Sequence, residues 1–218
     1  MSFNQDGTCI CVADFRGVRI FNVQSQEPVF SLDIGAISVS QMLFCTSLLA
    51  FVGAGEQPSL SPRKLTLFNT HNDSVIQSLS FPSTVLAVLL NRKRIAAILE
   101  RRAFLYNLET LELLGTLDTP PNPKGVAALT PCSEPSLLAL PAASGGFGGA
   151  PSTTAAGGAV RVYDVLQGTE VLAEIPAHKS ALGLLSWNQD GSLLASASQK
   201  GTVVRVHAMP SAATTHSL

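Results

Sequence analysis

The 218-residue chain carries 14 basic and 15 acidic residues, and 46% of its residues are hydrophobic. This balanced charge disfavours a general nucleic-acid binder and requires any anion site to be local. The longest apolar runs, such as 85–90, are far shorter than the ~20 residues of a spanning helix, so we expect them to be buried strands. The start of the chain lacks a signal-peptide pattern.

Short β-rich runs alternate with turn signals along the chain, and no segment keeps a helical period. One short phrase recurs at 18–22, 65–69, 103–107, 160–164 and, less cleanly, 204–207. Its last large side chain is Phe21, Phe68, Tyr106, Tyr163 and then His207, at intervals of 47, 38, 57 and 44 residues. One four-stranded propeller blade takes about 40–45 residues. The sequence therefore predicts an all-β propeller, with Phe21, Phe68, Tyr106 and Tyr163 at equivalent third-strand positions.

Blade boundaries follow from the repeat. We expect blades at about 1–35, 36–82, 83–122, 123–178 and 179–218. The fifth should be incomplete, because the sequence given reaches Leu218 where a fourth strand should begin. The Gly/Ala/Ser-rich stretch 142–159 is predicted to be an irregular, low-complexity loop inserted in the fourth blade. About four and a half WD-type blades favour an open ring that is a piece of a larger propeller, although a small closed ring is the alternative.

Four stretches carry a family resemblance. The run LLAFVGAGEQPSLSPRKL at 48–65 is the most specific, and 81–94, 119–124 and 177–206 support it. These stretches resemble the PROPPIN family, the WD-repeat phosphoinositide-interacting propellers of autophagy, over essentially the whole chain apart from the insertion. The resemblance implies a parent ring of seven blades. It also implies binding of phosphatidylinositol 3-phosphate and 3,5-bisphosphate.

The family signature is Phe or Leu followed by Arg-Arg-Gly, and each arginine serves one of two lipid sites. Alignment places Leu218 on its first position, so both arginines are absent from this sequence. The resemblance implies that this chain keeps one half of the first lipid site, formed by Ser196, Ser198, Gly201, Thr202 and Arg205, with His178 as a neighbour.

The residues themselves allow two interpretations of that set. Hydroxyl groups, the amide of Gly201 and the charges of Lys200 and Arg205 are suited to cradle a phosphate. The alternative is an ordinary WD-type strand-turn-strand with small residues on its face. His178 is equally suited to hold the blade-linking turn through a hydrogen bond.

A second candidate surface is the loop Glu56–Arg63, which ends at Pro62 and Arg63. The resemblance implies that the side bearing this loop binds the bridge-like lipid-transfer protein of autophagy, whereas the residues alone indicate only a Pro-limited turn. Five basic residues also bracket a predicted strand, namely Arg92, Lys93, Arg94, Arg101 and Arg102. A solvated rim is the default interpretation of these, and a partner surface is the alternative.

Catalysis and metal binding are not predicted. Ser180 lies close to His178 but has no orienting carboxylate, and the Gly-rich run 144–149 is not set in a βαβ unit. Cys9, Cys11, Cys45 and Cys132 lack metal-ligand spacing, so we expect reduced thiols, no metal and no cofactor.

The sequence and the resemblance together predict a non-enzymatic scaffold that couples phosphoinositide-containing membranes to autophagy proteins. It would be cytoplasmic and peripheral on preautophagosomal, endosomal or vacuolar membranes. The competing hypothesis is a WD-repeat protein-interaction scaffold without lipid binding, and the missing arginines are its best argument.

Overall fold

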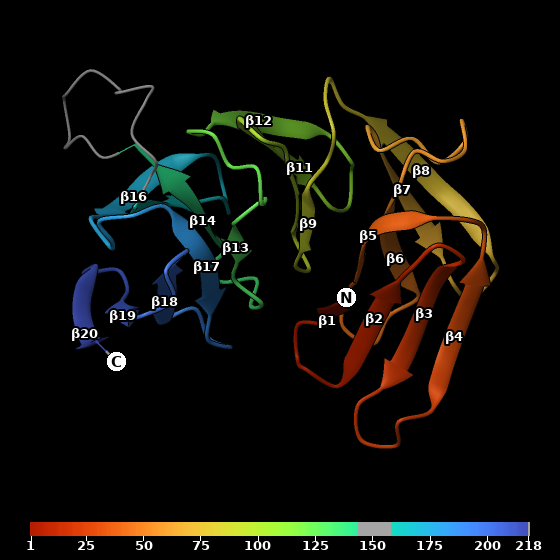
Figure 1. The fold of residues 1–218 in the computed structure, drawn as a ribbon, viewed down its shortest axis with the longest axis horizontal. Coiled ribbons are helices and arrows are strands. Elements are labelled where there is room, and N and C mark those ends of the chain that lie inside the picture. The colour runs from red at the N-terminus through yellow and green to blue at the C-terminus, as the bar shows by residue number, and fades with distance from the viewer. Residues whose placement is uncertain (144–157, 218) are drawn as a thin grey trace. The chain divides into compact units, whose positions relative to one another are not determined.

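The computed structural model describes residues 1–143 and 158–217. Within these ranges the chain forms strands and turns but no helix, and its strands make five four-stranded antiparallel sheets (Figure 1). The prediction of an all-β propeller is confirmed. The chain divides into two compact units, Met1–Leu90 and Asn91–Leu218, with the boundary between the first and second strands of the third sheet.

Unit 1 holds the first two blades and the first strand of the third. Its strands are β1 (Ser2–Phe3), β2 (Cys9–Ala13), β3 (Gly17–Asn22), β4 (Pro28–Asp33), β5 (Ile37–Met42), β6 (Leu48–Gly53), β7 (Lys64–Asn69), β8 (Ser74–Ser80) and β9 (Ala87–Leu90).

Unit 2 holds the rest of the third blade and two further blades. Its strands are β10 (Arg94–Ile98), β11 (Arg102–Asn107), β12 (Leu113–Asp118), β13 (Ala128–Leu129), β14 (Leu137–Ala142), β15 (Ala159–Asp164), β16 (Glu170–Ile175), β17 (Leu182–Trp187), β18 (Leu193–Ser198), β19 (Val204–Ala208) and β20 (Ala213–Ser217). In all five blades neighbouring strands are consecutive in sequence, so no described sheet joins strands from the two ends of the chain.

The recurring phrase forms the third strand of every blade. The pairing of third and fourth strands shifts register directly before Phe21, Phe68, Tyr106, Tyr163 and His207. The polar residue that follows the aromatic one starts the next turn. Asn107, for example, accepts backbone hydrogen bonds from Glu109 and Thr110 through its side-chain oxygen. The predicted equivalence of the four aromatic positions is therefore confirmed.

The phrase Asn-Gln-Asp-Gly occurs at 4–7 and again at 188–191, and it forms two matching hairpin turns. Asn4 accepts a hydrogen bond from the backbone of Cys9, and Asn188 accepts one from Leu193. Gly7 and Gly191 both have a φ of 73°, which favours glycine because it has no Cβ. Identical short phrases thus give identical turns in the first and fifth blades.

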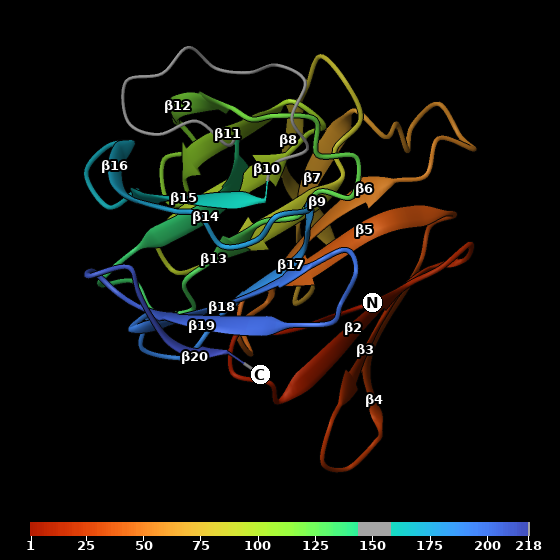
Figure 2. The ribbon, with the colours of Figure 1, turned by 60° about the vertical axis from the view of Figure 1, so that its left-hand side comes forward.

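The fifth blade is complete, which corrects the predicted half blade. Ala212, with a φ of 58°, reverses the chain after Ser211, and β20 then pairs with β19 as a fourth strand. Figure 2 shows β17, β18, β19 and β20 side by side in that order. The sequence alone missed β20 because Ala213–Ser217 contains no large apolar residue, and all five of its residues are exposed.

Part of the predicted insertion lies outside the described residues. Its two borders are regular, since Ala142 ends β14 and Ala159 begins β15, and both are buried. Residues 144–157 and Leu218 lie outside the described ranges. The alignment of Leu218 with the family signature therefore stays a prediction.

Each unit has its own apolar core. In unit 1 the core joins the first two blades through residues such as Cys11, Ile20 and Phe51. In unit 2 it joins the fourth and fifth blades, where Trp187 packs among Leu137, Val162 and Leu194 and donates a 3.1 Å hydrogen bond to the carbonyl of Ala128. This shared core fixes the fifth blade against the fourth.

Candidate anion-binding site on the fifth blade

The predicted site residues gather at one end of the fifth blade. Because neighbouring strands are antiparallel, the end of β16, the end of β18 and the start of β19 meet at the same edge. The backbone amide of Gln199 donates to the carbonyl of Ala181 at 2.8 Å, which joins the turn after β18 to the connection that carries His178. Gly201 closes that turn onto Ser198, with an N–O distance of 2.9 Å.

Hydrogen bonds link His178, Ser196 and Arg205 directly. The guanidinium Nη1 of Arg205 lies 2.5 Å from the carbonyl oxygen of Ala177 and 3.1 Å from Nδ1 of His178. The Nε2 of His178 lies 3.0 Å from the hydroxyl of Ser196. Ser196 and Arg205 also face each other across β18 and β19.

The chain of hydrogen bonds continues inward. The hydroxyl of Ser196 lies 3.2 Å from Nε2 of His207, whose Nδ1 lies 3.2 Å from the hydroxyl of Thr214. A guanidinium only donates, so Nδ1 of His178 must accept and its Nε2 must donate. If Ser196 gives its own proton to His207, His207 in turn donates to Thr214. Arg205 is thus held by His178 and the carbonyl of Ala177, and His178 is linked through Ser196 to His207.

Burial disfavours protonation of both imidazoles. Burial lowers the pKa of His178, and the neighbouring charge of Arg205 lowers it further. Burial also lowers the pKa of His207, followed by the effects of His178 and Arg205. His207 and Ser196 are 0% and 1% exposed, so they support the site from within.

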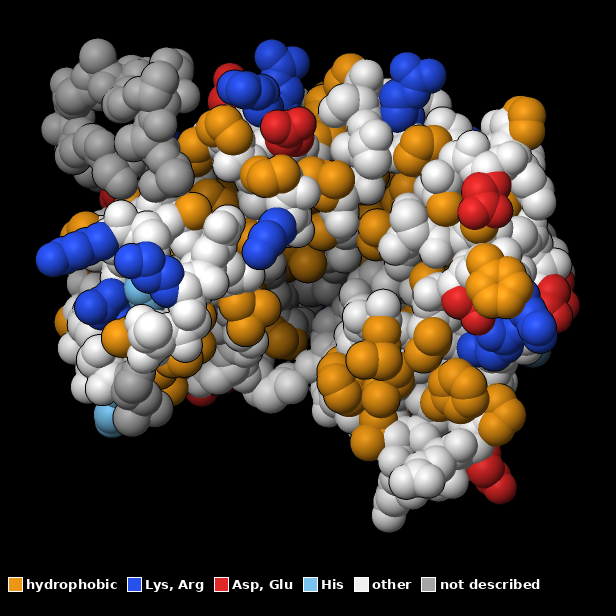
Figure 3. Space-filling view, viewed as in Figure 1, with side chains coloured by type: hydrophobic (Ala, Val, Ile, Leu, Met, Phe, Trp, Pro, Cys, Tyr) orange, Lys and Arg blue, Asp and Glu red, His pale blue; other side chains and the backbone are white. Residues whose placement is uncertain are grey.

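Exposure separates the predicted residues into two groups. Gly201 and Thr202 are exposed, with Lys200 beside them, whereas Arg205 and His178 are half-buried and Ser198 is buried. Gly201 has a φ of 67°, a conformation that favours glycine in this turn. Figure 3 shows basic side chains around a histidine over this end of the fifth blade. The exposed turn, Arg205 and His178 are therefore the parts that are accessible from solvent.

Arg205 differs electrostatically from the arginines at equivalent positions. Arg19 in the first blade pairs with Asp14 at 2.7 Å, and Arg161 in the fourth pairs with Glu174 at 2.9 Å. Glu174 lies opposite Arg161 in the β-ladder, but the residue opposite Arg205 is Ser217. Among the described residues Arg205 has no carboxylate partner. Its positive charge is therefore not neutralised by any described carboxylate.

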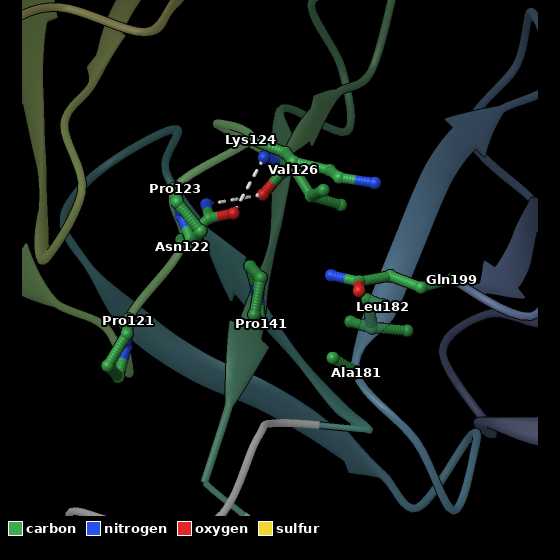
Figure 4. Close-up of a pocket in the computed structure, with 9 residues that line it drawn as sticks. All are labelled: Pro121, Asn122, Pro123, Lys124, Val126, Pro141, Ala181, Leu182 and Gln199. Atoms are coloured by element: carbon green, nitrogen blue, oxygen red, sulfur yellow. Dashed lines mark hydrogen bonds between the residues drawn. The ribbon is translucent and has the colours of Figure 1, made fainter.

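A small pocket adjoins this turn (Figure 4). It is lined by Pro121, Asn122, Pro123, Lys124, Val126, Pro141, Ala181, Leu182 and Gln199. Asn122 bonds the backbone of Val126 in both directions, at 2.9 and 2.8 Å, and so fixes the loop that carries Lys124. Lys124 and Gln199 were not predicted to lie near the site. The strand order could have indicated them, because the loop before β13 in the fourth blade and the loop after β18 in the fifth line the same pocket.

The prediction of a solvated basic rim is wrong for Arg94. Arg92, Lys93, Arg101 and Arg102 are exposed, as a solvated rim requires. Arg94 is buried, and its guanidinium donates to the carbonyls of Val165, at 2.5 Å, and of Leu166. Arg94 supports the turn after β15, because its donors satisfy backbone acceptors there.

The loop that ends at Pro62 and Arg63 is folded back on the second blade. Gly55 donates to the carbonyl of Leu60 at 3.0 Å, and Val85 donates to that of Pro62 at 2.9 Å. A Cβ on Gly53 would lie 2.0 Å from the carbonyl oxygen of Leu60, so this close approach requires glycine. Residues 56–59 and Arg63 are exposed, and Pro62 is half-buried. The loop is an ordered, exposed feature of unit 1.

The described residues form a propeller in which an arginine at one blade end has no carboxylate partner among them, and comparison with known proteins supplies the family. The PROPPIN family model matches residues 1–217. The chain is 39% identical to autophagy-related protein 18 of Mycosarcoma maydis, over 99% of this chain and 50% of that protein. It is 38% identical to autophagy-related protein 18b of Arabidopsis thaliana, over 100% of this chain and 56% of that protein.

Solved structures agree on the fold. A structure described as a complex of KlAtg21 with the coiled coil of AgAtg16 has a TM-score of 0.78 and 29% identity, covering 95% of this chain and 64% of that one. The chain belongs to the PROPPIN family. It spans about half the length of the curated relatives it matches.

The described residues contain neither a membrane-spanning helix nor a cluster of metal ligands. No helix there is long and apolar enough to cross a membrane. The same residues contain no group of three or more His, Cys, Asp or Glu side chains placed to hold a metal ion.

Proposed function

We propose that this chain supplies one half of a phosphoinositide site in a non-enzymatic autophagy scaffold. The ligand would be phosphatidylinositol 3-phosphate or 3,5-bisphosphate, bound at the end of the fifth blade. Arg205 would contact a phosphate and the exposed hydroxyl of Thr202 would donate a hydrogen bond to it. Gly201 and Ser198 would close the turn through their backbone hydrogen bond, and Ser196 would orient His178. Such a protein would act on preautophagosomal, endosomal or vacuolar membranes from the cytoplasm.

The uncompensated charge of Arg205 is the observation that carries this proposal. Removing a phosphate from water costs free energy. Several aligned hydrogen-bond donors and more than one cation are needed to offset that cost. Arg205 has no carboxylate partner among the described residues, while Arg19 and Arg161 do. Lys200 is exposed in the same turn, so the local charge is positive.

The sequence given contains no Arg-Arg-Gly segment, so the second half of the site must come from elsewhere. We expect residues 1–218 to bind phosphoinositide vesicles weakly or not at all. Adding the blades that the longer relatives possess should restore binding, and Arg205→Ala should then remove it.

Vesicle flotation tests this proposal. Vesicles with and without phosphatidylinositol 3-phosphate would be incubated with residues 1–218, the extended protein and its Arg205→Ala variant. Arg161→Ala is the matched control, because Arg161 occupies the same repeat position but is paired with Glu174. Headgroup-specific binding that survives Arg205→Ala would exclude the fifth-blade site. Strong binding by residues 1–218 alone would show that another basic surface recognises the headgroup.

A protein partner would use the loop that ends at Pro62 and Arg63. The exposure of residues 56–59 and the ordered path of the loop support a recognition surface. The proposed partner is the lipid-transfer protein of autophagy. Replacing Pro62 and Arg63 by alanine should weaken its co-precipitation and leave vesicle binding unchanged. Undiminished recovery of the partner would remove this part of the proposal.

The second candidate function is a protein-interaction scaffold without lipid binding. One observation favours it: a solved neighbour, KlAtg21, is described in complex with the coiled coil of AgAtg16. This alternative predicts that the extended protein shows no dependence on phosphatidylinositol 3-phosphate in the flotation assay.

A further inference from the structure

Two cysteine thiols lie together where the first two blades of unit 1 meet. Cys9 is the first residue of β2, and Cys45 lies in the turn between β5 and β6. The sulfur of Cys45 is 3.2 Å from the hydroxyl of Thr8 and 3.7 Å from the amide nitrogen of Asn4. Asn4 in turn accepts a 3.0 Å hydrogen bond from the backbone of Cys9. Cys45 therefore packs directly on the turn that leads into Cys9.

The two thiols differ in accessibility. Cys45 is exposed, whereas Cys9 is 6% exposed and belongs to the core. Burial raises the pKa of the Cys9 thiol, and the nearby Cys45 raises it further. Because Cys45 is exposed, it is the thiol that a dissolved oxidant meets first, and Cys9 is the buried thiol at the end of the turn on which Cys45 packs.

The other cysteines do not share this arrangement. Cys11 is 0% exposed and its thiol donates a 3.1 Å hydrogen bond to the hydroxyl of Ser40. Cys132 lies in unit 2, where its thiol contacts the carbonyl of Pro135 at 3.3 Å. Among the described residues, only Cys45 is an exposed thiol that packs on the turn leading into a second cysteine, Cys9.

We propose that Cys45 and Cys9 form a peroxide-sensitive thiol pair that closes to a disulfide. Hydrogen peroxide oxidises the Cys45 thiol to a sulfenic acid, forming an S–O bond, and is itself reduced to water. The Cys9 sulfur then attacks the Cys45 sulfur, the S–S bond forms, and the hydroxyl group leaves with the Cys9 proton as a second water. Two hydrogens are lost from the protein in total. A thiol reductant reverses the reaction.

The disulfide would join the first blade to the second. Cys9 lies in the β2 strand of one sheet and Cys45 in a turn of the next, so the bond would restrain these sheets from separating. The pair lies in unit 1, while the candidate anion site lies in unit 2. The proposal is therefore independent of the proposed function.

Mass spectrometry of the reduced, full chain after brief hydrogen peroxide treatment tests the pair. Free thiols would be blocked with N-ethylmaleimide before trypsin digestion. Cys9 falls in the tryptic peptide 1–16 and Cys45 in 20–63, so the disulfide appears as a cross-link between them that dithiothreitol removes. Because Cys11 shares the first peptide, the experiment is repeated with Cys11→Ala. We expect a loss of about 2 Da and the cross-link in both proteins.

Two variants make the result decisive. Cys45→Ser changes an exposed residue and should abolish the cross-link without affecting the fold. Cys9→Ser should leave the Cys45 sulfenic acid without its partner, so that dimedone labels Cys45 much more than in the unmodified chain. If Cys9→Ser fails to fold, the Cys45→Ser and Cys11→Ala results alone decide. A cross-link to Cys11 or Cys132, or oxidation of Cys45 with no cross-link, would overturn the proposal.

Discussion

The fourth and fifth blades are built on the same repeat but carry different chemistry. Leu140 in β14 lies opposite Arg161, and Ser196 in β18 lies opposite Arg205. All six residues of β14 are buried, while buried and partly exposed residues alternate along β18. Tyr163 holds the aromatic position in the fourth blade, where the fifth has the fully buried His207.

The difference shows what distinguishes the blade with the candidate site from a blade that only supports the fold. In the fourth blade an apolar residue faces the arginine and a carboxylate neutralises it, so the arginine only stabilises the sheet. In the fifth, hydroxyl and imidazole groups replace the apolar and aromatic side chains and hold an arginine that has no described carboxylate partner. Substitutions that exchange these features test the comparison.

The largest expected effect concerns the core that the two blades share. Trp187→Ala should lower the free energy of unfolding of unit 2 by about 3–5 kcal/mol, because it leaves a cavity among residues of both blades. Trp187→Phe should cost less, about 1–2 kcal/mol, since it removes chiefly the hydrogen bond to Ala128. Urea unfolding measures both. A cost below about 1 kcal/mol for Trp187→Ala would show that the blades do not share this core.

A smaller effect, visible mainly as a pH dependence, is expected from His207. The folded-state pKa of His178 and of His207 is lower than the ordinary value of 6.5, so the unfolded chain binds more protons. The stability linked to these groups is complete above 6.5 and is lost as the pH falls through the lower folded-state values. We therefore expect unit 2 to lose stability between neutral and mildly acidic pH.

His207→Phe restores the aromatic side chain of the other repeats and should reduce this loss. At neutral pH it should cost about 1 kcal/mol, because Ser196 keeps His178 but loses His207 as a partner. The deficit should shrink as the pH falls. His71→Ala, at an exposed position in unit 1, controls for removal of an imidazole. A deficit that grows on acidification would contradict the expected protonation.

The smallest effect is expected for the paired arginine of the fourth blade. Arg161→Ala should lower stability by about 0.5–1 kcal/mol, because the ion pair with Glu174 is partly exposed. Arg102→Ala, which removes a more exposed pair with Asp118, should cost less. Neither change should alter vesicle binding by the extended protein. Loss of binding in Arg161→Ala would break the distinction between the two blades.

The repeated blades could be predicted from the sequence, because equivalent strands need the same alternation of apolar and polar residues. It failed at β20, since an exposed edge strand buries no apolar side chain and so leaves no pattern. It also failed at Arg94, because a charged residue in a basic run is buried only when distant acceptors, here Val165 and Leu166, satisfy its donors. Whether Arg205 has a carboxylate partner depends on which residue of the fourth strand lies opposite it. The recurring third-strand phrase does not specify that residue.

The most direct test of the central claim is to neutralise Arg205 in the way that the fourth blade neutralises Arg161. Ser217→Glu places a carboxylate opposite Arg205, at the position that Glu174 holds opposite Arg161, and Ser217 is exposed enough to accept it. Its matched control is Ser217→Gln, which adds similar bulk without charge. The measurement is the affinity of the extended protein for vesicles containing phosphatidylinositol 3-phosphate. We predict at least about a tenfold loss with Ser217→Glu and little change with Ser217→Gln. Equal, undiminished affinity in both variants would contradict the claim that the free charge of Arg205 makes this blade end an anion site.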